Sequence, residues 1–190
     1  MNYHSVINHF YKEDDALKHI LLVHSRRVAD RALLIARRHP ELRLDEDFLE
    51  AAAMLHDIGI IRCNAPSIQC FGTEPYICHG RLGAEMLRKL QSSGFKFEVS
   101  EDDWEALARV CERHTGAGLT KEAIVRQNLP LPHEDFLPET TAEQVICYAD
   151  KFYSKTRLEH EKTLEQAAHS LEKFGEEGVL RFRKWAQMFE

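Results

Sequence analysis

The chain has 190 residues, of which 44% are hydrophobic, and its formal net charge is -6. This length suits one well-buried core, so we expect a single domain with a core over about residues 17–157 and a helical extension over about residues 160–190. Acidic and basic residues are interspersed, and no basic block is present to follow a nucleic-acid backbone or an anionic membrane, so we expect neither polymeric nucleic acid nor a membrane as a partner.

No apolar run approaches the ~20 residues that cross a bilayer, and the first residues are polar and aromatic, unlike a signal peptide. We therefore expect a cytoplasmic protein. The cysteines are odd in number and form no Cys-x-x-Cys pair, which argues against a disulfide framework. Cys63, Cys70 and Cys78 with His79 are an alternative zinc site, which their irregular spacing disfavours.

Apolar residues recur at helical spacing almost throughout the chain. In a predicted helix over about residues 14–38, Leu17, Leu21 and Val28 share one face with His24, which therefore points inward. Asp45 can cap a second helix that leads to His56 and Asp57. We expect Gly59 to end this helix in a left-handed conformation.

The next helices carry further histidines. After a loop over residues 62–73, Pro75 is expected to open a helix that carries His79. Asp102 and Asp103 suit the positive end of the following helix, which delivers His114 before Gly116 and Gly118 stop it. Each histidine thus lies at or near the end of an apolar helical face.

The last predicted helix of the core ends in an acidic residue. After a connection marked by prolines, Thr141 begins a helix that delivers Asp150. From about Thr163 the chain continues as amphipathic helix, interrupted at Gly175 and Gly178. With no convincing strand, the pattern predicts an all-α fold, a helical bundle with additional C-terminal helices.

Several imidazoles and carboxylates in these positions are the ligand set of a hydrolytic metal site. The candidate ligands are His24, His56, Asp57, His79, His114 and Asp150. They exceed what one ion needs, and the two oxygens of Asp57 can bridge two ions roughly 3.5 to 4 Å apart, which favours a dinuclear centre. Taken singly, each has an ordinary interpretation as a hydrogen-bonded core histidine, a capping pair or a buried salt-bridge partner.

Nitrogen and oxygen donors without thiolate favour iron, manganese, zinc or cobalt over copper(I) or an iron-sulfur cluster, without choosing among them. We expect two divalent ions, iron or manganese first, with zinc, cobalt, nickel and magnesium as alternatives.

His24, His56-Asp57 and Asp150 resemble the ligand series of the HD superfamily of metal-dependent phosphohydrolases, and Leu55-His56-Asp57-Ile58-Gly59 reads as its HDIG variant. His79 and His114 resemble the extra histidines of its dinuclear branch, which includes symmetrical diadenosine tetraphosphate hydrolases. The similarity to predicted HDIG phosphohydrolases extends over about residues 22–157.

The resemblance implies a division of the ligands. One metal would be held by His24, His56, Asp57 and Asp150, and the second by Asp57, His79 and His114. A hydroxide bridging the ions would attack a phosphomonoester or phosphoanhydride of a nucleotide or other small phosphorylated metabolite.

Substrate contacts are expected from basic and hydroxyl side chains near the ligands. Arg27 lies one turn after His24 and resembles a family arginine suited to clamp phosphate; together with Lys151 and Asp57 it forms the expected catalytic set. Ordinary surface ion pairing is an equal alternative for Arg27 and Lys151. Further candidates for substrate binding are Arg81, Thr115, and Arg157 or Lys155.

Two departures from the family pattern narrow the range of expected activities. Ile60 follows Gly59 where many relatives have lysine, and Gly116-Ala117-Gly118 stands where the cyclic di-GMP branch has Gly-Tyr-Pro, so we do not expect that activity. Alternatives remain open: an HD-type di-iron oxygenase, a non-catalytic nucleotide-binding regulator, and a metal-stabilised structural domain. The sequence leaves the oligomeric state open.

Overall fold

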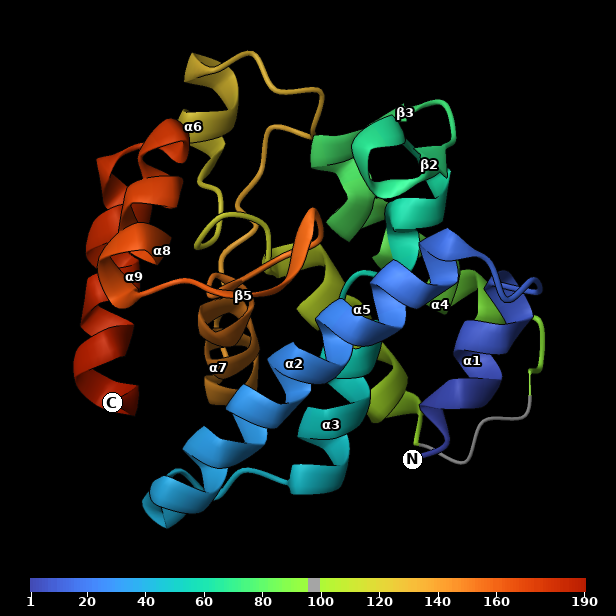
Figure 1. Cartoon of the computed structure of the whole chain (residues 1–190), viewed down its shortest axis with the longest axis horizontal. Helices are drawn as coiled ribbons and strands as arrows, with labels where there is room; N and C mark the ends of the chain where they lie inside the picture. The colour runs from blue at the N-terminus through green and yellow to red at the C-terminus, as the bar shows by residue number, and fades with distance from the viewer. Residues whose placement is uncertain (96–99) are drawn as a thin grey trace.

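The computed structural model describes residues 1–95 and 100–190, and these residues form an all-α fold with a few short strands (Figure 1). The α-helices are α1 (Tyr3–Phe10), α2 (Ala16–Arg38), α3 (Glu46–Leu55), α4 (His79–Ser92), α5 (Glu101–Arg113), α6 (Lys121–Arg126), α7 (Thr141–Asp150), α8 (Leu164–Leu171) and α9 (Glu176–Phe189). The strands are β1 (Cys63–Ala65), β2 (Cys70–Phe71), β3 (Glu74–Pro75), β4 (Tyr153–Ser154) and β5 (Arg157–Glu161). Short 3-10 helices include η2 (Ile58–Arg62), η3 (Pro66–Ile68), η4 (Tyr76–Cys78) and η5 (Glu172–Phe174).

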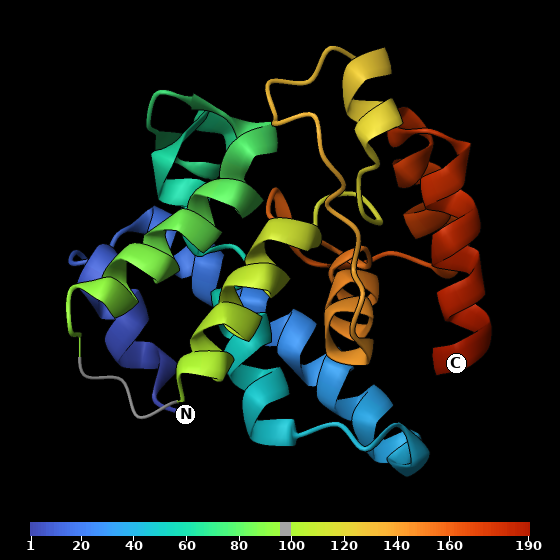
Figure 2. The same cartoon turned by 180° about the vertical axis from the view of Figure 1, so that it is seen from behind.

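The long helix α2 crosses the middle of the molecule and packs against α3 and α7, while α4 packs along α5. The helix α1 lies at one side of this bundle, and α8 and α9 lie at the other, as both views show (Figures 1 and 2). The main apolar cluster joins buried residues of all these helices except α6. None of the helices in the described ranges combines the length and apolar character needed to cross a lipid bilayer.

Side-chain caps set where several helices begin. Asp15 accepts the backbone N–H of Lys18 at the start of α2, and Asp45 accepts those of Asp47 and Phe48 at the start of α3. The helices α5, α7 and α8 begin with reciprocal capping boxes. The predicted helix over residues 14–38 and the predicted cap at Asp45 are therefore confirmed.

Two glycines behave differently from expectation. Gly59 does not end the helix in a left-handed conformation, because the backbone continues into η2. A Cβ on Gly59 would lie 2.2 Å from His79 O and 2.4 Å from Gly83 N, so glycine is needed here for close approach to α4. Gly178 does not interrupt the C-terminal helix but lies within α9, whereas Gly175, with φ of 111°, does separate η5 from α9.

The strands are the main departure from the predicted all-helical pattern. The strand β1 pairs with β2 and β3, and β4 pairs with β5 in a hairpin that follows α7. Pro75 consequently ends β3, and the α-helix begins at His79 after η4. These strands are two to five residues long, and β5 is mostly charged, so neither length nor alternation signals them.

The C-terminal helices pack directly on the helix that ends at Asp150. The ring of Tyr148 in α7 lies 4.9 Å from that of Phe182 and 5.5 Å from that of Phe189, both in α9, measured between ring centroids. All three residues are almost completely buried. The extension therefore shares its apolar contacts with the ligand-bearing part of the chain.

Candidate metal centre

Six buried side chains from five helical segments converge at one place. His24 faces inward from α2, His56 and Asp57 follow the end of α3, and His79 is the first residue of α4. His114 directly follows α5, and Asp150 is the last residue of α7. His56 and Asp57 are fully buried, and Asp150 is 8% exposed. The structure thus brings together all six residues that the sequence singled out.

Four of these residues form the first candidate ligand group: His24, His56, Asp57 and Asp150. The Nε2 atom of His24 lies 3.1 Å from Asp57 Oδ2 and 3.0 Å from Asp150 Oδ1. The Nε2 atom of His56 lies 3.0 Å from Asp57 Oδ2 and 3.6 Å from Asp150 Oδ1. Two imidazole nitrogens and two carboxylates therefore surround a common point.

Asp57 also belongs to a second candidate group, with His79 and His114. Its other oxygen, Oδ1, lies 3.4 Å from the Nε2 atom of each histidine. The two Nε2 atoms of His79 and His114 are 3.0 Å apart. The two oxygens of Asp57 thus face two different pairs of histidines.

Backbone carbonyls fix the orientation of three of the imidazoles. Nδ1 of His56 lies 2.6 Å from Ala53 O, Nδ1 of His79 lies 2.6 Å from Tyr76 O, and Nδ1 of His114 lies 2.7 Å from Cys111 O. A carbonyl only accepts, so each Nδ1 is the protonated nitrogen. In the neutral form of each ring, the Nε2 lone pair is then directed into the cluster, as metal ligation requires.

Unsatisfied polar atoms indicate that this cluster fits divalent cations. Both ring nitrogens of His24, Nε2 of His56 and Oδ1 of Asp57 are buried without a hydrogen-bond partner, whereas Oδ2 of Asp57 faces the Lys155 ammonium group. Buried polar atoms without partners are costly, and carboxylate oxygens and imidazole nitrogens brought this close are stabilised by a cation between them. The donor set suits iron, manganese, zinc or cobalt.

Burial disfavours the charged forms of His56, Asp57, His79, His114 and Asp150, but neighbouring charges shift their pKa values in different directions. At His56 the attraction of Asp57 and Asp150 outweighs burial and raises the pKa to about 9. At His79 burial and the adjacent His114 lower the pKa to about 3, and burial also lowers the pKa of His114. The surrounding positive groups hold the pKa values of Asp57 and Asp150 well below their ordinary range, despite burial.

Two lysines reach the cluster from the segment after α7. Lys151 Nζ donates to Asp150 Oδ2 at 2.5 Å and to His114 O at 2.9 Å. Lys155, in the turn between β4 and β5, places its Nζ 2.6 Å from Asp57 Oδ2, with a side chain only 11% exposed. We expected Lys155 only as an alternative to Arg157 on a continuing helix; the hairpin turn, which the sequence pattern does not signal, brings it into the site.

Three arginines expected at the substrate lie away from the pocket lining. The Arg27 guanidinium donates to Leu158 O and lies 4.8 Å from the centre of the Tyr153 ring. Arg81 pairs with Glu85, and Arg157 is exposed on β5. The roles of these arginines therefore stay predictions, with Arg27 engaged by the β4–β5 hairpin.

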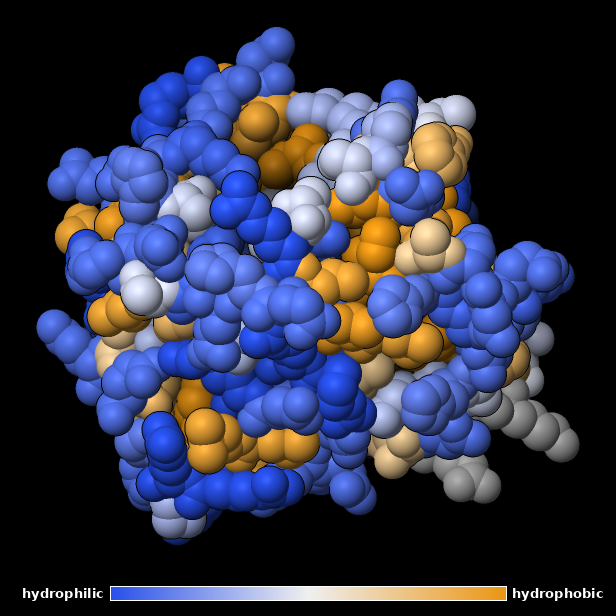
Figure 3. All heavy atoms as spheres, in the orientation of Figure 1, coloured by the Kyte–Doolittle hydropathy of each residue, from blue (hydrophilic) through white to orange (hydrophobic). Residues whose placement is uncertain are grey.

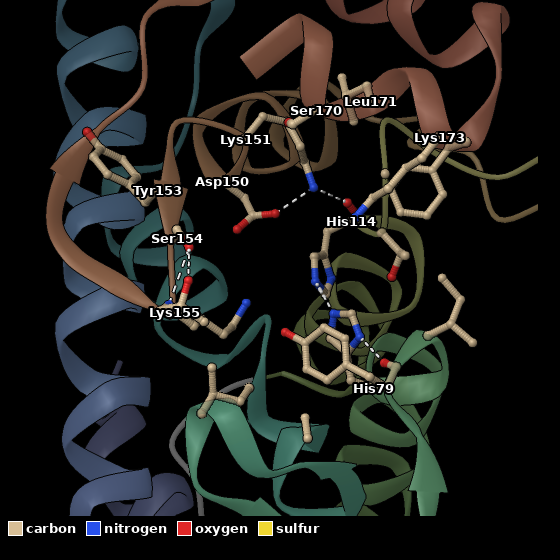
Figure 4. Close-up of a pocket in the computed structure, with 18 of the residues that line it drawn as sticks. His79, His114, Asp150, Lys151, Tyr153, Ser154, Lys155, Ser170, Leu171 and Lys173 are labelled. Carbon is tan, nitrogen blue, oxygen red and sulfur yellow. Dashed lines mark hydrogen bonds and ion pairs between the residues drawn. The ribbon is translucent and has the colours of Figure 1, made fainter. Parts of the chain in front are cut away.

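A cavity of about 630 Å³ opens from the ligand cluster toward the C-terminal helices. Its lining includes His79, His114 and Asp150, together with the predicted contacts Thr115 and Lys151 (Figure 4). The space-filling view shows a hollow in a mainly hydrophilic face, between α6 and the segment that holds β2 and β3 (Figure 3). The ligands are thus connected to a pocket of the size that takes small molecules.

The alternative cysteine site is not supported. Burial raises the pKa of Cys63 to about 12 and that of Cys70 to about 11, which disfavours the thiolates that zinc requires. Cys78 donates to Pro130 O at 3.3 Å. Within the described residues, neither candidate ligand group contains a cysteine, and His79 belongs to the second group with Asp57 and His114.

Several known proteins are similar to this chain over 63% to 80% of its length. An uncharacterized protein of Methanocaldococcus jannaschii is 34% identical over 125 residues, which make up 66% of this chain and 60% of that protein. A tRNA (cytidine(56)-2'-O)-methyltransferase of Picrophilus torridus is 36% identical over 120 residues, which make up 63% of this chain and 28% of the relative. Another protein of that name, from Thermoplasma volcanium, is 27% identical over 162 residues, or 80% of this chain and 40% of the relative.

The chain thus spans between 28% and 60% of the length of these relatives. Their names do not support the narrower resemblance to diadenosine tetraphosphate hydrolases. No solved structure matches the chain. A family model described as the HD domain matches residues 21–154. Since this match covers more than half of the chain and contains all six clustered residues, the chain belongs to the HD domain family.

Proposed function

We propose that this protein is a metal-dependent phosphohydrolase that cleaves a phosphomonoester or phosphoanhydride of a nucleotide or other small phosphorylated metabolite. The observation that carries the proposal is the position of Asp57, whose two oxygens face two separate pairs of histidine nitrogens in a fully buried setting. A structural site for one ion has no use for a second set of ligands beside an open cavity.

His24, His56, Asp57 and Asp150 would hold one divalent cation, and Asp57, His79 and His114 the other, with iron or manganese as the first candidates. Such cations, when bound, lower the pKa of coordinated water toward ~7 and offset the charge on phosphoryl oxygens. Catalysis then needs no serine or cysteine nucleophile.

The protein's own cations complete the site. Lys151 and Lys155 both line the cavity beside the cluster. Their ammonium groups would bind the non-bridging oxygens of a phosphoryl group that lies beside the candidate metal centre. They would also hold the leaving group in place. Arg27 stays a candidate only if the β4–β5 hairpin releases its guanidinium.

The cavity supports a small substrate. A volume of about 630 Å³ lies within the usual range for small-molecule sites. Four of its lining residues are lysines, in a chain with a net charge of -6, which favours an anion at this place.

The relatives named as tRNA methyltransferases suggest one addition to the candidate substrates. Their printed names describe transfer to a ribose 2'-oxygen, but this chain corresponds to less than half of either protein. We therefore do not extend methyl transfer to this chain, because a buried cluster of carboxylates and imidazoles is suited to hydrolysis. Nucleoside phosphates that carry phosphate on the ribose belong among the substrates to be tested.

The test combines metal analysis with a screen for released phosphate. Protein purified without chelator should contain divalent metal and should release phosphate from at least one nucleotide, dinucleoside polyphosphate or sugar phosphate. Asp57→Asn should abolish the release, whereas Asp47→Asn, at an exposed position in the first turn of α3, should not. Substrate-dependent oxygen uptake without phosphate release would instead identify an oxygenase, and tight nucleotide binding without product would identify a regulator.

A further inference from the structure

The outer wall of the cavity is built by residues that lie beyond the HD domain match. The match ends at residue 154. Lys162, Ser170, Lys173 and Phe174 line the cavity from the segments around α8 and η5 (Figure 4). The ligand cluster and this wall therefore come from different parts of the chain and face the same space.

The charges of this wall differ from those near the ligands. Lys151 and Lys155 are paired with Asp150 and Asp57. Within the described residues, neither Lys162 nor Lys173 forms an ion pair with a carboxylate. Two cations without a carboxylate partner thus line the outer part of the cavity.

Lys162 is also partly removed from water. Its Nζ donates to Lys151 O at 3.1 Å. Burial lowers the pKa of Lys162, and the positive charges of Lys151, Lys173 and Lys155 lower it further against the attraction of Asp150. An anion bound beside the half-buried Lys162 would stabilise the positive charges gathered around it.

The wall is fixed to the ligand-bearing part of the chain by specific contacts. Gln127 Nε2 donates to Phe174 O at 2.9 Å, and Arg181 donates to Ala117 O at 3.1 Å. The Phe174 ring packs so closely on Gly116 that a Cβ there would lie 3.3 Å from it. Because Gly116 follows His114 by two residues, the position of Lys173 is tied to that of the second ligand group.

We propose that Lys162 and Lys173 form a second anion subsite and that the substrate is an organic bisphosphate, with two phosphate groups on separate atoms of one scaffold. This inference rests on the proposed function, because one phosphate is assigned to the ligand cluster. The other phosphate binds the two lysines of the C-terminal wall, and the rest of the molecule spans the cavity between them. Substrates with a single phosphate leave these lysines without an anion and bind more weakly.

The kinetic test uses matched substrates and matched variants. Lys173→Ala and Lys162→Gln, which keeps a donor for Lys151 O, should each raise the KM for adenosine 3',5'-bisphosphate about tenfold, as expected for the loss of one charged hydrogen bond. The KM for adenosine 5'-monophosphate should change less than about twofold, within the range of surface substitutions. Lys184→Ala, at an exposed position of α9 outside the cavity lining, should change neither value. Equal effects on both substrates, or no effect, would overturn the subsite.

A binding measurement separates this inference from the proposed function. Butane-1,4-diphosphonate and butylphosphonate are not hydrolysed, so calorimetry with the metal-loaded protein reports their affinity without turnover. Lys173→Ala should weaken butane-1,4-diphosphonate binding about tenfold and leave butylphosphonate binding unchanged. If the wild-type protein hydrolyses no phosphate ester, the proposed function fails while this measurement still decides the subsite. If hydrolysis occurs but the diphosphonate affinity does not change, only the subsite fails.

Discussion

Asp57 is the residue on which the two ligand groups depend, because it alone belongs to both. If each of its oxygens serves a different ion, the histidines on either side should be separable by substitution. We expect His79→Ala and His114→Ala each to remove one equivalent of metal and to leave the other, with phosphate release reduced more than about 100-fold. Metal content per chain, measured by inductively coupled plasma mass spectrometry, tests the expected loss of one equivalent.

The control for these variants is His169→Ala in α8, whose exposed side chain forms an ion pair with Glu172 in η5. It should keep full metal content and activity. Full activity in both His79→Ala and His114→Ala would contradict a dinuclear centre.

Lys155 presents a cation to the same carboxylate that the metals would share. Its Nζ lies 2.6 Å from Asp57 Oδ2, so it repels any divalent ion that binds there. We expect Lys155→Ala to bind manganese roughly tenfold more tightly while hydrolysing substrate more slowly, since a competing charge and a phosphate contact are lost together. Manganese titration followed by electron paramagnetic resonance measures the affinity independently of turnover.

An exposed lysine near the N-terminus, Lys12, supplies the comparison, and Lys12→Ala should leave both quantities unchanged. Weaker manganese binding in Lys155→Ala would show that the lysine supports the metal site instead of competing with it.

The sequence predicted the positions of the six clustered residues because each lies on an apolar helical face or at its end. It could not predict the position of Lys155, which depends on a hairpin turn after α7 instead of a continuing helix. The same hairpin supplies the carbonyl of Leu158 that engages Arg27. Contacts between segments distant in sequence leave no periodic signal. The sequence therefore predicted the residues near the substrate less well than it predicted the candidate metal ligands.

At the scale of elements, Gly59 sets how closely η2 approaches α4. A Cβ at this position would lie 2.2 Å from His79 O, and backbone atoms cannot move aside cheaply. We expect Gly59→Ala to lower the free energy of unfolding by at least about 2 kcal/mol and to reduce metal content, because it pushes His79 away from Asp57. Urea denaturation and metal analysis of the folded fraction check the two effects.

Gly178 offers a matched comparison within α9. A Cβ there would meet only Ala117 Cβ, at 3.9 Å. Gly178→Ala should therefore stabilise the protein by about 0.5–1 kcal/mol through helix propensity. Similar stabilities for the two alanine variants would contradict the close approach at Gly59.

The cap of α3 gives a second prediction at this scale. The Asp45 side chain accepts two backbone N–H groups, 2.9 Å from Asp47 N and 3.1 Å from Phe48 N. Asp45→Ala should lower the free energy of unfolding by about 1 kcal/mol. Asp47→Ala, two residues later in the first turn of α3, should stay within about 0.5 kcal/mol of the wild type. An equal loss in both variants would mean that helix charge, not capping, sets the stability.

Helices were predicted well because apolar spacing and capping residues act locally. The starts of α2, α3 and α7 follow from the side-chain caps Asp15, Asp45 and Thr140. The strands were missed because β1, β2 and β3 are held by pairing with each other and not by their own composition. Gly178 was taken for a helix break, but the packing of α9 on α7 outweighs the low helix propensity of one glycine.

For the whole molecule, metal binding should be coupled to stability. The ligands come from α2, α3, α4, α5 and α7, so a bound ion joins most of the bundle, and unfolding separates its ligands. Manganese at about 100 times its dissociation constant should raise the melting temperature of chelator-treated protein by about 5–10 °C. Differential scanning calorimetry measures the shift.

Asp57→Asn is the corresponding control, because it removes the carboxylate common to both groups. Its melting temperature should respond little to manganese. A full shift in this variant would mean that the stabilising ion binds elsewhere.

The first and last members of the ligand set, His24 and Asp150, are separated by most of the HD domain, and their side-chain atoms nevertheless lie 3.0 Å apart. No local stretch of the polypeptide can assemble the coordination sphere by itself. Misfolded or partly assembled molecules would therefore remain metal-poor, and the ratio of metal to protein becomes a measure of the native fraction in any preparation. Specific activities normalised to bound metal, instead of total protein, would then compare variants on equal terms.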